Sequence, residues 1–352
     1  MALSLPKGLD LKEFVEEKTN VKMEDFFEST IKEYDEFDEY CWNRGEGYKI
    51  PMAPMATEKI EGLEPGMYLF AGESNTGKTA IMMNLLYSIA THPENNLYGV
   101  YYSLDDSKYE IIPRVIAMNE RIPIGVCAKP ERYKVQIAKY SENAHEYDEW
   151  LERREEGIKR LKANSEYFKI VDSNTIKSAE ALHEHIGKIK KYIKAQNPDA
   201  NIIVAIDALN DIRFKEKNLS PGVELHSEIA KTIKGWAVEY DIPIFGSCHL
   251  RKLNAMRRPV LDDLKESGEY VYESSVVWLV YNDVGKNKQG ATIYYHEEGR
   301  DDKRPVIELD WAKNKKSSFK GRTYYYFVDN MSRATECDEE VTDRFNTLIY
   351  ES

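Results

Sequence analysis

The sequence predicts an α/β fold in which a mainly parallel central sheet is flanked by helices. Apolar runs of strand length alternate with segments of helical periodicity along most of the chain, and this alternation is typical of parallel sheets. One apolar run leads into a Gly-rich loop and another ends in an aspartate, two features of nucleotide-binding α/β domains. A β-rich C-terminal part and a short helical N-terminal arm complete the prediction.

The Gly-rich loop lies between an apolar strand at 67–71 and a helix at 79–90. Its sequence, Gly72-Glu73-Ser74-Asn75-Thr76-Gly77-Lys78-Thr79, has the G-x-x-x-x-G-K-T pattern of a P-loop and is followed by Ala80. Such a loop wraps a polyphosphate with its N–H groups, and the helix presents its positive end to the same anion. We expect Lys78 to reach the terminal phosphates and Thr79 to bind Mg²⁺. The flanking strand and helix make a Gly-rich turn without function the less favoured interpretation.

Composition and length set limits on the class of protein. The chain has 352 residues, of which 42% are hydrophobic, enough for one large or two modest domains with an ordinary core. It has no run of about 18 apolar residues and no signal-peptide core near its start, so we expect neither membrane spanning nor secretion. The four cysteines show no C-x-x-C pairing, which favours a reducing cytoplasm, or the host cytoplasm if the protein is viral.

The net charge of −12 would ordinarily argue against a nucleic-acid partner, because Lys and Arg supply most of the affinity for phosphates. The charge is unevenly distributed, however. Residues 1–43 contain twelve acidic and five basic residues, so the other 309 residues share only −5 of the total. Residues 250–258 and 311–322 are basic runs without an acid. Each run is either a solvated face or part of a binding surface.

The remaining elements alternate in order along the chain. Further strands are predicted at 99–104, 167–172, 201–207, 243–248 and 275–281, and in the C-terminal part at 291–296, 305–311 and 324–328. Arg114 lies on the helix that follows 99–104, and the charged segment 131–164 predicts surface helices. His183 and His185 are two positions apart on a predicted helix, so they point to different faces, and exposed helical positions are favoured over a metal site.

Two strand ends carry candidate catalytic side chains. Apolar residues precede Asp207, the pattern of a central parallel strand whose terminal carboxylate holds Mg²⁺ through its water. The position of this run after a P-loop, in an alternating strand–helix chain, favours a metal-binding role. His249 ends the strand that we expect beside that of Asp207, where a sensor of the γ-phosphate would lie.

Three regions are predicted: an acidic helical arm at 1–43, a main domain at 44–335 and a C-terminal tail at 336–352. The arm is expected to form two short amphipathic helices, whose apolar residues are Leu11, Phe14 and Val15 in the first and Phe26, Phe27, Ile31 and Tyr34 in the second. These residues are too few to make a core. The helices must therefore lie either on the rest of the same chain or on a neighbouring subunit.

Several short segments give the chain a family resemblance over about residues 50–328. With the P-loop and the Asp207 strand, the sequence resembles the superfamily-4 replicative helicases, that is, the DnaB type and its phage primase–helicase relatives. The segment at 263–268 is close to the family's D-L-R-E-S-G and is the most specific match. The matching segments are Ser103-Leu104-Asp105 with Arg114 nine positions on, Ser247-Cys248-His249-Leu250, Asp263-Leu264-Lys265-Glu266-Ser267-Gly268, and Lys313-Asn314-Lys315 with Gly321.

The resemblance implies a RecA-like fold that binds ATP and Mg²⁺, and it implies a role for each matching residue. Lys78, Thr79 and Asp207 would hold the triphosphate and the metal. Asp105 would align with the glutamate that polarises the attacking water. The γ-phosphate would be sensed by Arg114 and His249.

Two further groups of residues receive roles from the same resemblance. Lys313 and Lys315 would match the two basic finger residues that reach the nucleotide of the neighbouring subunit. Lys265, Glu266 and Gly268 would grip the backbone of single-stranded DNA in a central channel, and residues 213–223 would form the other channel loop.

Two positions depart from the family pattern. Asp105 is one methylene shorter than glutamate, so either the loop moves inward, Asp106 takes part, or hydrolysis is slow. Lys315 replaces an arginine and supplies charge without the planar fork, which predicts weaker stabilisation of the transition state.

The function that the resemblance implies is a hexameric ring that moves 5′–3′ on single-stranded DNA and unwinds duplex at the replication fork. Primase, polymerase or a helicase loader would be further partners. The arm at 1–43 stands where the family has a collar or primase domain, and we interpret it as docking on the adjacent subunit. The missing collar and the histidine at 249 favour a phage origin.

Two other functions remain open from the sequence. The first is a RecA-like ATPase that binds single-stranded DNA, a recombinase or loader that does not unwind duplex DNA. The residues of the P-loop, Gly72 to Thr79, suggest it. The second is a nucleotide-gated assembly factor that does not hydrolyse ATP, which Asp105 suggests. The segments at 263–268 and 313–315 favour the helicase over both.

Overall fold

The computed structural model describes residues 23–43, 47–140, 146–176, 178–251 and 257–350, with the side chains of a few of these left out. The chain divides into two compact units, Met1–Glu46 and Gly47–Ser352. The described part of the first unit is one acidic helix, α2 (Met23–Asn43), on which Ile31, Tyr34 and Phe37 are exposed. The first of the two predicted arm helices, with Leu11, Phe14 and Val15, lies outside the described residues.

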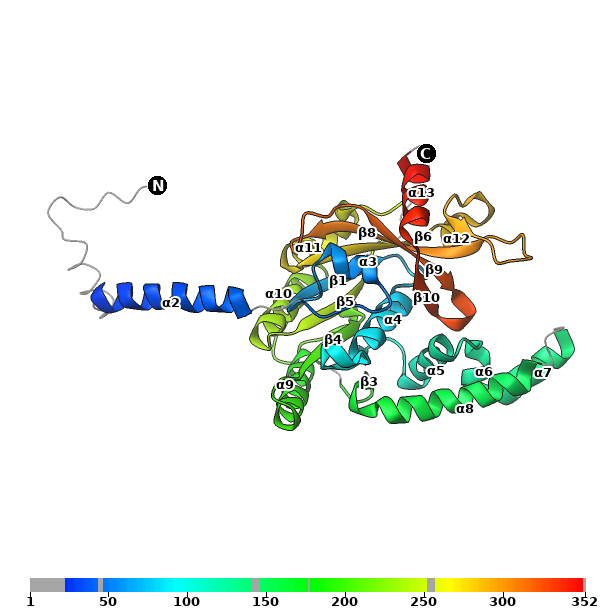
Figure 1. The fold of residues 1–352 in the computed structure, drawn as a ribbon, viewed down its shortest axis with the longest axis horizontal. Helices are drawn as coiled ribbons and strands as arrows, with labels where there is room; N and C mark the ends of the chain where they lie inside the picture. Colours follow the sequence, from blue (N-terminus) through cyan, green and yellow to red (C-terminus); the bar gives the residue numbers. More distant parts are fainter. Residues whose placement is uncertain (1–22, 44–46, 141–145, 177, 252–256, 351–352) are drawn as a thin grey trace. The chain divides into compact units, whose positions relative to one another are not determined.

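The described residues of the second unit form a ten-stranded sheet in the order β10-β9-β8-β6-β1-β5-β4-β2-β3, with β7 paired to β8 (Figure 1). Six strands run parallel, which confirms the predicted α/β fold: β1 (Gly66–Gly72), β2 (Leu97–Ser103), β3 (Phe168–Asp172), β4 (Asn201–Asp207), β5 (Pro243–His249) and β6 (Val276–Asn282). The C-terminal strands are antiparallel: β7 (Tyr294–Tyr295), β8 (Arg304–Asn314), β9 (Arg322–Val328) and β10 (Arg333–Glu336).

Helices cover both faces of the sheet. The face that holds Tyr68 and Phe70 packs against α3 (Pro54–Lys59), α4 (Lys78–Ala90) and α5 (Lys108–Glu120). The opposite face, with Met67 and Leu69, packs against α9 (Ala179–Gln196), α10 (Val223–Glu239) and α11 (Gly268–Glu273). Because successive side chains of a strand point to opposite faces, a strand covered on both sides is apolar throughout, as β1 and β4 are.

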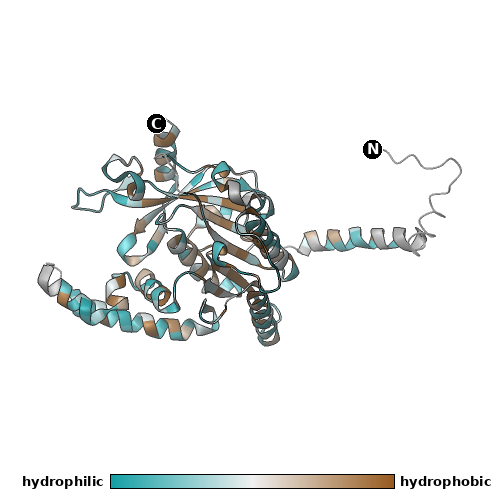
Figure 2. Cartoon of the chain, turned by 180° about the vertical axis from the view of Figure 1, so that it is seen from behind, coloured by the Kyte–Doolittle hydropathy of each residue, from teal (hydrophilic) through white to brown (hydrophobic). Residues whose placement is uncertain are grey.

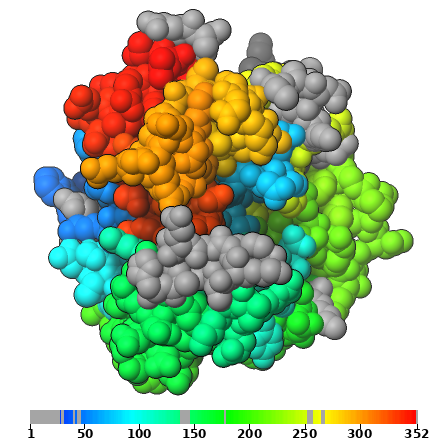
Figure 3. Space-filling model, turned by 90° about the vertical axis from the view of Figure 1, so that its right-hand side faces the viewer, coloured from blue at the N-terminus to red at the C-terminus, as the bar shows by residue number. Residues whose placement is uncertain are grey.

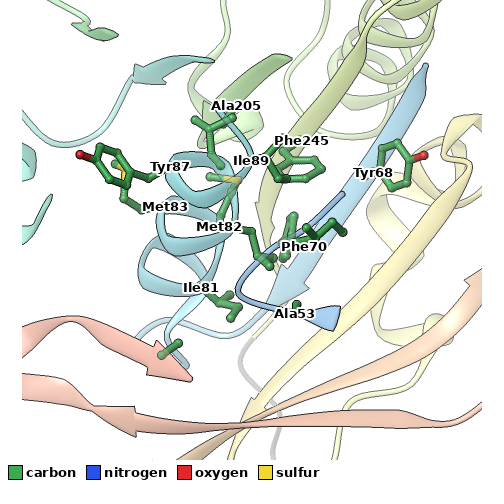
Figure 4. Close-up of a cluster of buried hydrophobic side chains, with 14 of the residues drawn as sticks. Ala53, Tyr68, Phe70, Ile81, Met82, Met83, Tyr87, Ile89, Ala205 and Phe245 are labelled. Atoms are coloured by element: carbon green, nitrogen blue, oxygen red, sulfur yellow. The ribbon is translucent and has the colours of Figure 1, made fainter. Parts of the chain in front are cut away.

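The core beside the P-loop helix is rich in aromatic and aliphatic side chains. Figure 4 shows Ile81, Met82 and Ile89 of α4 beside Phe70 and Phe245 of the sheet. Apolar residues concentrate along the strands in Figure 2, whereas the outer helices carry hydrophilic residues. The segment predicted as surface helices contains α7 (Pro130–Tyr140) and α8 (Tyr147–Ala163), which follow α6 (Ile124–Ala128).

Two predicted segments differ in the structure. The strand predicted at 291–296 is limited to β7, because the backbone N–H groups of Thr292 and Ile293 donate to the Asp283 carboxylate, at 2.7 and 2.9 Å, and not to a strand. The segment predicted as a tail includes α13 (Glu339–Tyr350), whose Phe345 is buried against Tyr324, with ring centroids 5.2 Å apart. Much of the segment therefore packs with the sheet.

The two histidines of α9 are half-buried and not exposed as expected. His183 lies 2.9 Å from Glu239 and stacks on Trp236, while His185 lies 2.8 Å from the Tyr102 hydroxyl. Different neighbours hold each ring, in agreement with their pointing to different faces.

Strand register places Asp207 and His249 at the same edge of the sheet as the P-loop. Gly72 is paired with His249, and Ser103 is paired with Asp207. Since β1, β5, β4 and β2 are parallel, their carboxyl ends meet there, which is where open α/β sheets bind ligands.

Candidate nucleotide-binding site

The P-loop connects β1 to α4 through two residues with positive φ, Asn75 at 63° and Gly77 at 95°. The positive φ favours glycine at 77, and a Cβ there would also lie 2.7 Å from Cδ1 of Ile307, whose side chain would have to shift. A Cβ at Gly72 would lie 2.7 Å from the carbonyl oxygen of Val280. The loop is closed by the Thr76 hydroxyl, which donates to the Glu73 carbonyl at 2.9 Å. The sequence thus forms the strand–loop–helix arrangement that phosphate binding needs.

Lys78 is buried at the start of α4. Its Nζ donates to the carbonyl oxygens of Gly72 and Glu73, at 2.9 and 2.7 Å, so the side chain curls over the loop. Burial lowers the pKa of Lys78, and the nearby Cys248 and Asp207 oppose this effect. An ammonium held in this position is available to the phosphates of a nucleotide in the loop.

Asp207 is the centre of a hydrogen-bond cluster at the end of β4. Its Oδ2 accepts hydrogen bonds from the hydroxyls of Thr79, at 2.7 Å, and Tyr101, at 2.6 Å, and its Oδ1 accepts one from Ser247. The two predicted metal ligands, Thr79 and Asp207, are therefore in direct contact. Hydroxyl and carboxylate oxygens are the donors that Mg²⁺ prefers, so this pair fits that metal.

The two candidate carboxylates after β2 have different surroundings. Asp106 forms an ion pair with Arg114 of α5 at 3.1 Å, and burial raises the pKa of Asp106. Asp105 is exposed, and its charge helps to raise the pKa of Asp211, for which burial is the main cause. Asp105 is thus near Asp211 on the open side of the cluster, while Asp106 is occupied by Arg114.

His249 lies at the end of β5, beside the P-loop. Its backbone N–H donates to Oδ1 of Asn210 at 3.0 Å. His249 is exposed at the surface. Its pKa is nevertheless lowered, first by partial burial of the ring and second by the positive charge of Lys78. Both effects favour the neutral ring, which can act as a hydrogen-bond donor.

Lys313 and Lys315 do not meet the P-loop of their own chain. They lie at the end of β8, where Lys313 is paired with Val277 near the start of β6, whereas the P-loop follows the carboxyl end of β1. Both ammonium groups donate to carbonyls at the end of α11: Lys313 to those of Val271 and Tyr272, the latter at 3.0 Å, and Lys315 to that of Tyr272, at 3.3 Å. Burial, followed by the charge of Lys315, lowers the pKa of Lys313 to about 8.

The predicted DNA-binding residues lie on a short 3₁₀ helix, η5 (Leu261–Ser267), and at the start of α11. The side chains of Lys265 and Glu266 lie outside the described part. Gly268 is exposed, and a Cβ there would meet nothing within 4 Å, so packing within the chain does not require glycine. The other predicted channel loop, 213–223, is held to α9 by Glu180, which accepts the backbone N–H of Lys215 at 3.0 Å.

Sequence reasoning missed several contacts of the site. Ser247 lies within a recognised motif, but its bond to Asp207 follows only from the neighbouring positions of β4 and β5. Tyr101 lies two positions before Ser103 on β2, so the two side chains are on the same face of the sheet. That alternation could have placed Tyr101 on the face that packs against α4. Nothing in the sequence pairs Lys286 with Glu73 of the P-loop, which it contacts at 2.6 Å.

The P-loop, the Asp207 cluster and the sheet order define a RecA-like P-loop fold. The sequence profile of the "DnaB-like helicase C terminal domain" matches residues 55–334, and the chain belongs to this family. None of the helices in the described part of the chain is long and apolar enough to cross a membrane.

Individual relatives agree with this family. The chain is 25% identical over 254 residues to a probable replicative DNA helicase of Trieres chinensis, covering 71% of this chain and 48% of that protein. It is 23% identical over 312 residues to the replicative DNA helicase DnaB of Mycoplasma pneumoniae, covering 82% of this chain and 60% of that protein. The chain thus matches about half to three-fifths of the length of these curated relatives.

Solved structures show the same fold. A structure described as an ATPase domain superposes with a TM-score of 0.66 and 20% identity, covering 88% of this chain and 98% of that chain. A DnaB-like replicative helicase, described with its interactions with primase, superposes with a TM-score of 0.65 and 19% identity, covering 88% and 66%. These likenesses confirm the predicted RecA-like fold.

Proposed function

We propose that this protein is an ATP-driven motor that moves along single-stranded DNA and unwinds duplex at a replication fork. The observation that carries the proposal is the single sheet edge at which Lys78, Thr79, Asp207 and His249 lie, in a chain of the DnaB-like family. Family relatives are named replicative DNA helicases, which supports the same function.

Hydrolysis would be phosphoryl transfer to water, driven by positioning and by neutralisation of charge. A Mg²⁺ ion bound with the nucleotide supplies charge neutralisation at the phosphates. Thr79 and Asp207 would hold that ion, and Lys78 would contact the terminal phosphates. Asp105, exposed on the open side, would orient the attacking water, while Asp106 holds Arg114 in place.

The nucleotide would lie at a subunit boundary. Lys313 and Lys315 are at the opposite edge of the sheet from the P-loop of their own chain, so they can serve as basic fingers only for another copy. A repeated head-to-tail contact of this kind forms a ring when the rotation between neighbours closes, and a hexamer fits the family.

Binding of DNA would go through its phosphates and would be independent of base sequence and sensitive to salt. Lys265, Glu266 and Gly268 would form one contact element and the loop 213–223 the other. A structural neighbour is described with primase, so primase is a candidate partner, as are a polymerase and a helicase loader. We further propose 5′–3′ movement, action in the cytoplasm, and docking of the acidic arm on the adjacent subunit.

A forked-duplex unwinding assay with ATP, run beside Lys78→Ala, tests the proposal. We expect strand separation by the wild-type protein and none by the variant. Hydrolysis that single-stranded DNA stimulates without unwinding would favour the recombinase or loader, and nucleotide binding without turnover would favour the assembly factor. The helicase assignment is falsified if no nucleotide supports unwinding and single-stranded DNA leaves ATP hydrolysis unchanged.

A further inference from the structure

Two buried carboxylates and a partly buried arginine lie beside the nucleotide site, and the chemistry above does not use them. The Arg258 guanidinium forms two parallel bonds, at 2.7 and 2.8 Å, with the carboxylate of Glu308 on β8, whose side chain is 1% exposed. Asp283, with a side chain 2% exposed, lies 3.8 Å from the same guanidinium. Burying two carboxylates costs free energy that apolar packing of this region could have avoided, so the cluster calls for a role beyond stability.

The residue before Arg258 holds a different element. Arg257 forms a bidentate pair with Asp263 of η5, at 2.6 and 2.8 Å, and Asp263 also accepts the backbone N–H of Val260 at 2.8 Å. Adjacent residues of one chain segment therefore fasten the proposed DNA-contacting element to β8. Bidentate arginine–carboxylate pairs fix direction as well as distance.

The same cluster reaches the P-loop through a short helix, α12 (Asp283–Asn287). Asp283 begins α12, and its carboxylate also anchors the backbone of Thr292 and Ile293. Three positions on, Lys286 forms its ion pair with Glu73 of the P-loop at 2.6 Å. In Figure 3 the yellow-to-orange segment that contains α12 lies at the surface of the molecule, above the green α8. One end of α12 thus touches Arg258 and the other touches the P-loop.

We propose that Arg257, Arg258 and Lys286 form a positioning clamp that couples the P-loop to the element 261–273. The clamp rests on the proposed function, since it links nucleotide to DNA. When the P-loop closes on a nucleotide, Glu73 moves with it, and the ion pair with Lys286 shifts α12. Arg258, which is hydrogen-bonded to Glu308 and forms an ion pair with Asp283 at 3.8 Å, then carries the movement through Arg257 to Asp263. These arginines and Lys286 are positioning residues, because they act through the P-loop and the DNA element that they contact.

Hydrogen exchange measured with and without a slowly hydrolysed ATP analogue and Mg²⁺ tests the clamp. We expect nucleotide to slow amide exchange at both 72–79 and 261–273 in the wild-type protein. In Lys286→Met the slowing at 72–79 should remain and that at 261–273 should be lost. Arg258→Lys keeps the positive charge but loses the planar guanidinium that binds a carboxylate through two bonds, so it should also lose the response at 261–273 and keep that at 72–79. The double variant Arg258→Lys, Lys286→Met should show no greater loss of the response at 261–273 than either single variant.

Lys288→Met is the matched control, because Lys288 is exposed on the neighbouring turn and its replacement removes the same charge. It should behave as wild type. The clamp is contradicted if Lys286→Met keeps the response at 261–273, or if Lys288→Met loses it equally. Stimulation of ATP hydrolysis by single-stranded DNA, expressed relative to the basal rate of the same protein, should fall several-fold in Lys286→Met. If the wild type shows the exchange response but no such stimulation, the proposed function fails and the clamp stands.

Discussion

His249 illustrates how a residue's surroundings decide its chemistry. Its pKa is lowered, mainly by partial burial, so the ring is neutral at pH 7 and can offer a hydrogen bond but no charge. An amide side chain can make the same kind of bond.

We therefore expect His249→Gln to retain most ATP hydrolysis and His249→Ala to lose about tenfold to a hundredfold, since a hydrogen bond to a charged group contributes about 1.5–3 kcal/mol. Steady-state ATP turnover measures this. If Gln is as inactive as Ala, donation of a hydrogen bond is not the role of His249.

Lys313 gives a prediction about pH. With its pKa lowered to about 8, the ammonium is charged below that pH and loses its charge as pH rises through it. If Lys313 must be positively charged to support hydrolysis, activity should be lost as the pH rises above that pKa. The value of kcat/KM, which reports the ionisation of the free enzyme, should therefore decline around pH 8.

Lys313→Arg keeps its charge throughout and should show no such decline. The measurement is kcat/KM for ATP in the presence of single-stranded DNA, from about pH 6.5 to about pH 9.5, for both proteins. Identical profiles would show that Lys313 does not act as a charge.

At this scale, local sequence patterns predict candidate residues, whereas their contacts come from the structure. The P-loop and Asp207 follow from local patterns, so their positions could be predicted from the chain alone. Whether Asp105 or Asp106 faces the site could not, because it depends on Arg114 of α5 taking Asp106. The pairs Lys286–Glu73 and Arg258–Glu308 join residues far apart in sequence, with no motif to connect them.

Among the elements, β1 determines where the P-loop lies. Phe70 in this strand is fully buried, 5.4 Å from the Phe245 ring and 4.7 Å from the Trp278 ring, measured between centroids. Removing such an aromatic side chain leaves a cavity that neighbouring strands cannot fill.

Phe70→Ala should lower the free energy of unfolding by about 3–5 kcal/mol in urea titrations. Tyr350→Ala, at a position 80% exposed, should change it by less than about 0.5 kcal/mol. Equal effects from the two substitutions would contradict the assignment of Phe70 to the core.

The parallel strands were predictable because they are buried on both faces and so appear as continuous apolar runs. The contacts of the short C-terminal elements could not be predicted in this way. Asp283 holds the backbone of 292 and 293 in place of a strand partner. The helix α13 packs through Phe345 on Tyr324 of β9, a contact that no local signal identifies.

For the whole molecule, the acidic arm offers a test of assembly. The exposed Ile31, Tyr34 and Phe37 of α2 form an apolar side on an otherwise acidic helix, and such a surface is expected to be covered by a partner. Deleting residues 1–43 should dissociate the ring, as measured by light scattering with an ATP analogue present. An unchanged oligomer would show that the arm does not join subunits.

Our central claim is that nucleotide is hydrolysed between two subunits, with Lys78 from one and Lys313 and Lys315 from the next. Mixing two inactive proteins tests this most directly: Lys78→Ala, and the double variant Lys313→Ala, Lys315→Ala. Random assembly places an intact P-loop beside intact fingers at about a quarter of the boundaries in a ring. We predict that ATP hydrolysis stimulated by single-stranded DNA, absent from each protein alone, returns in the mixture; a mixture as inactive as its parts, with mixed rings demonstrated, would contradict the account.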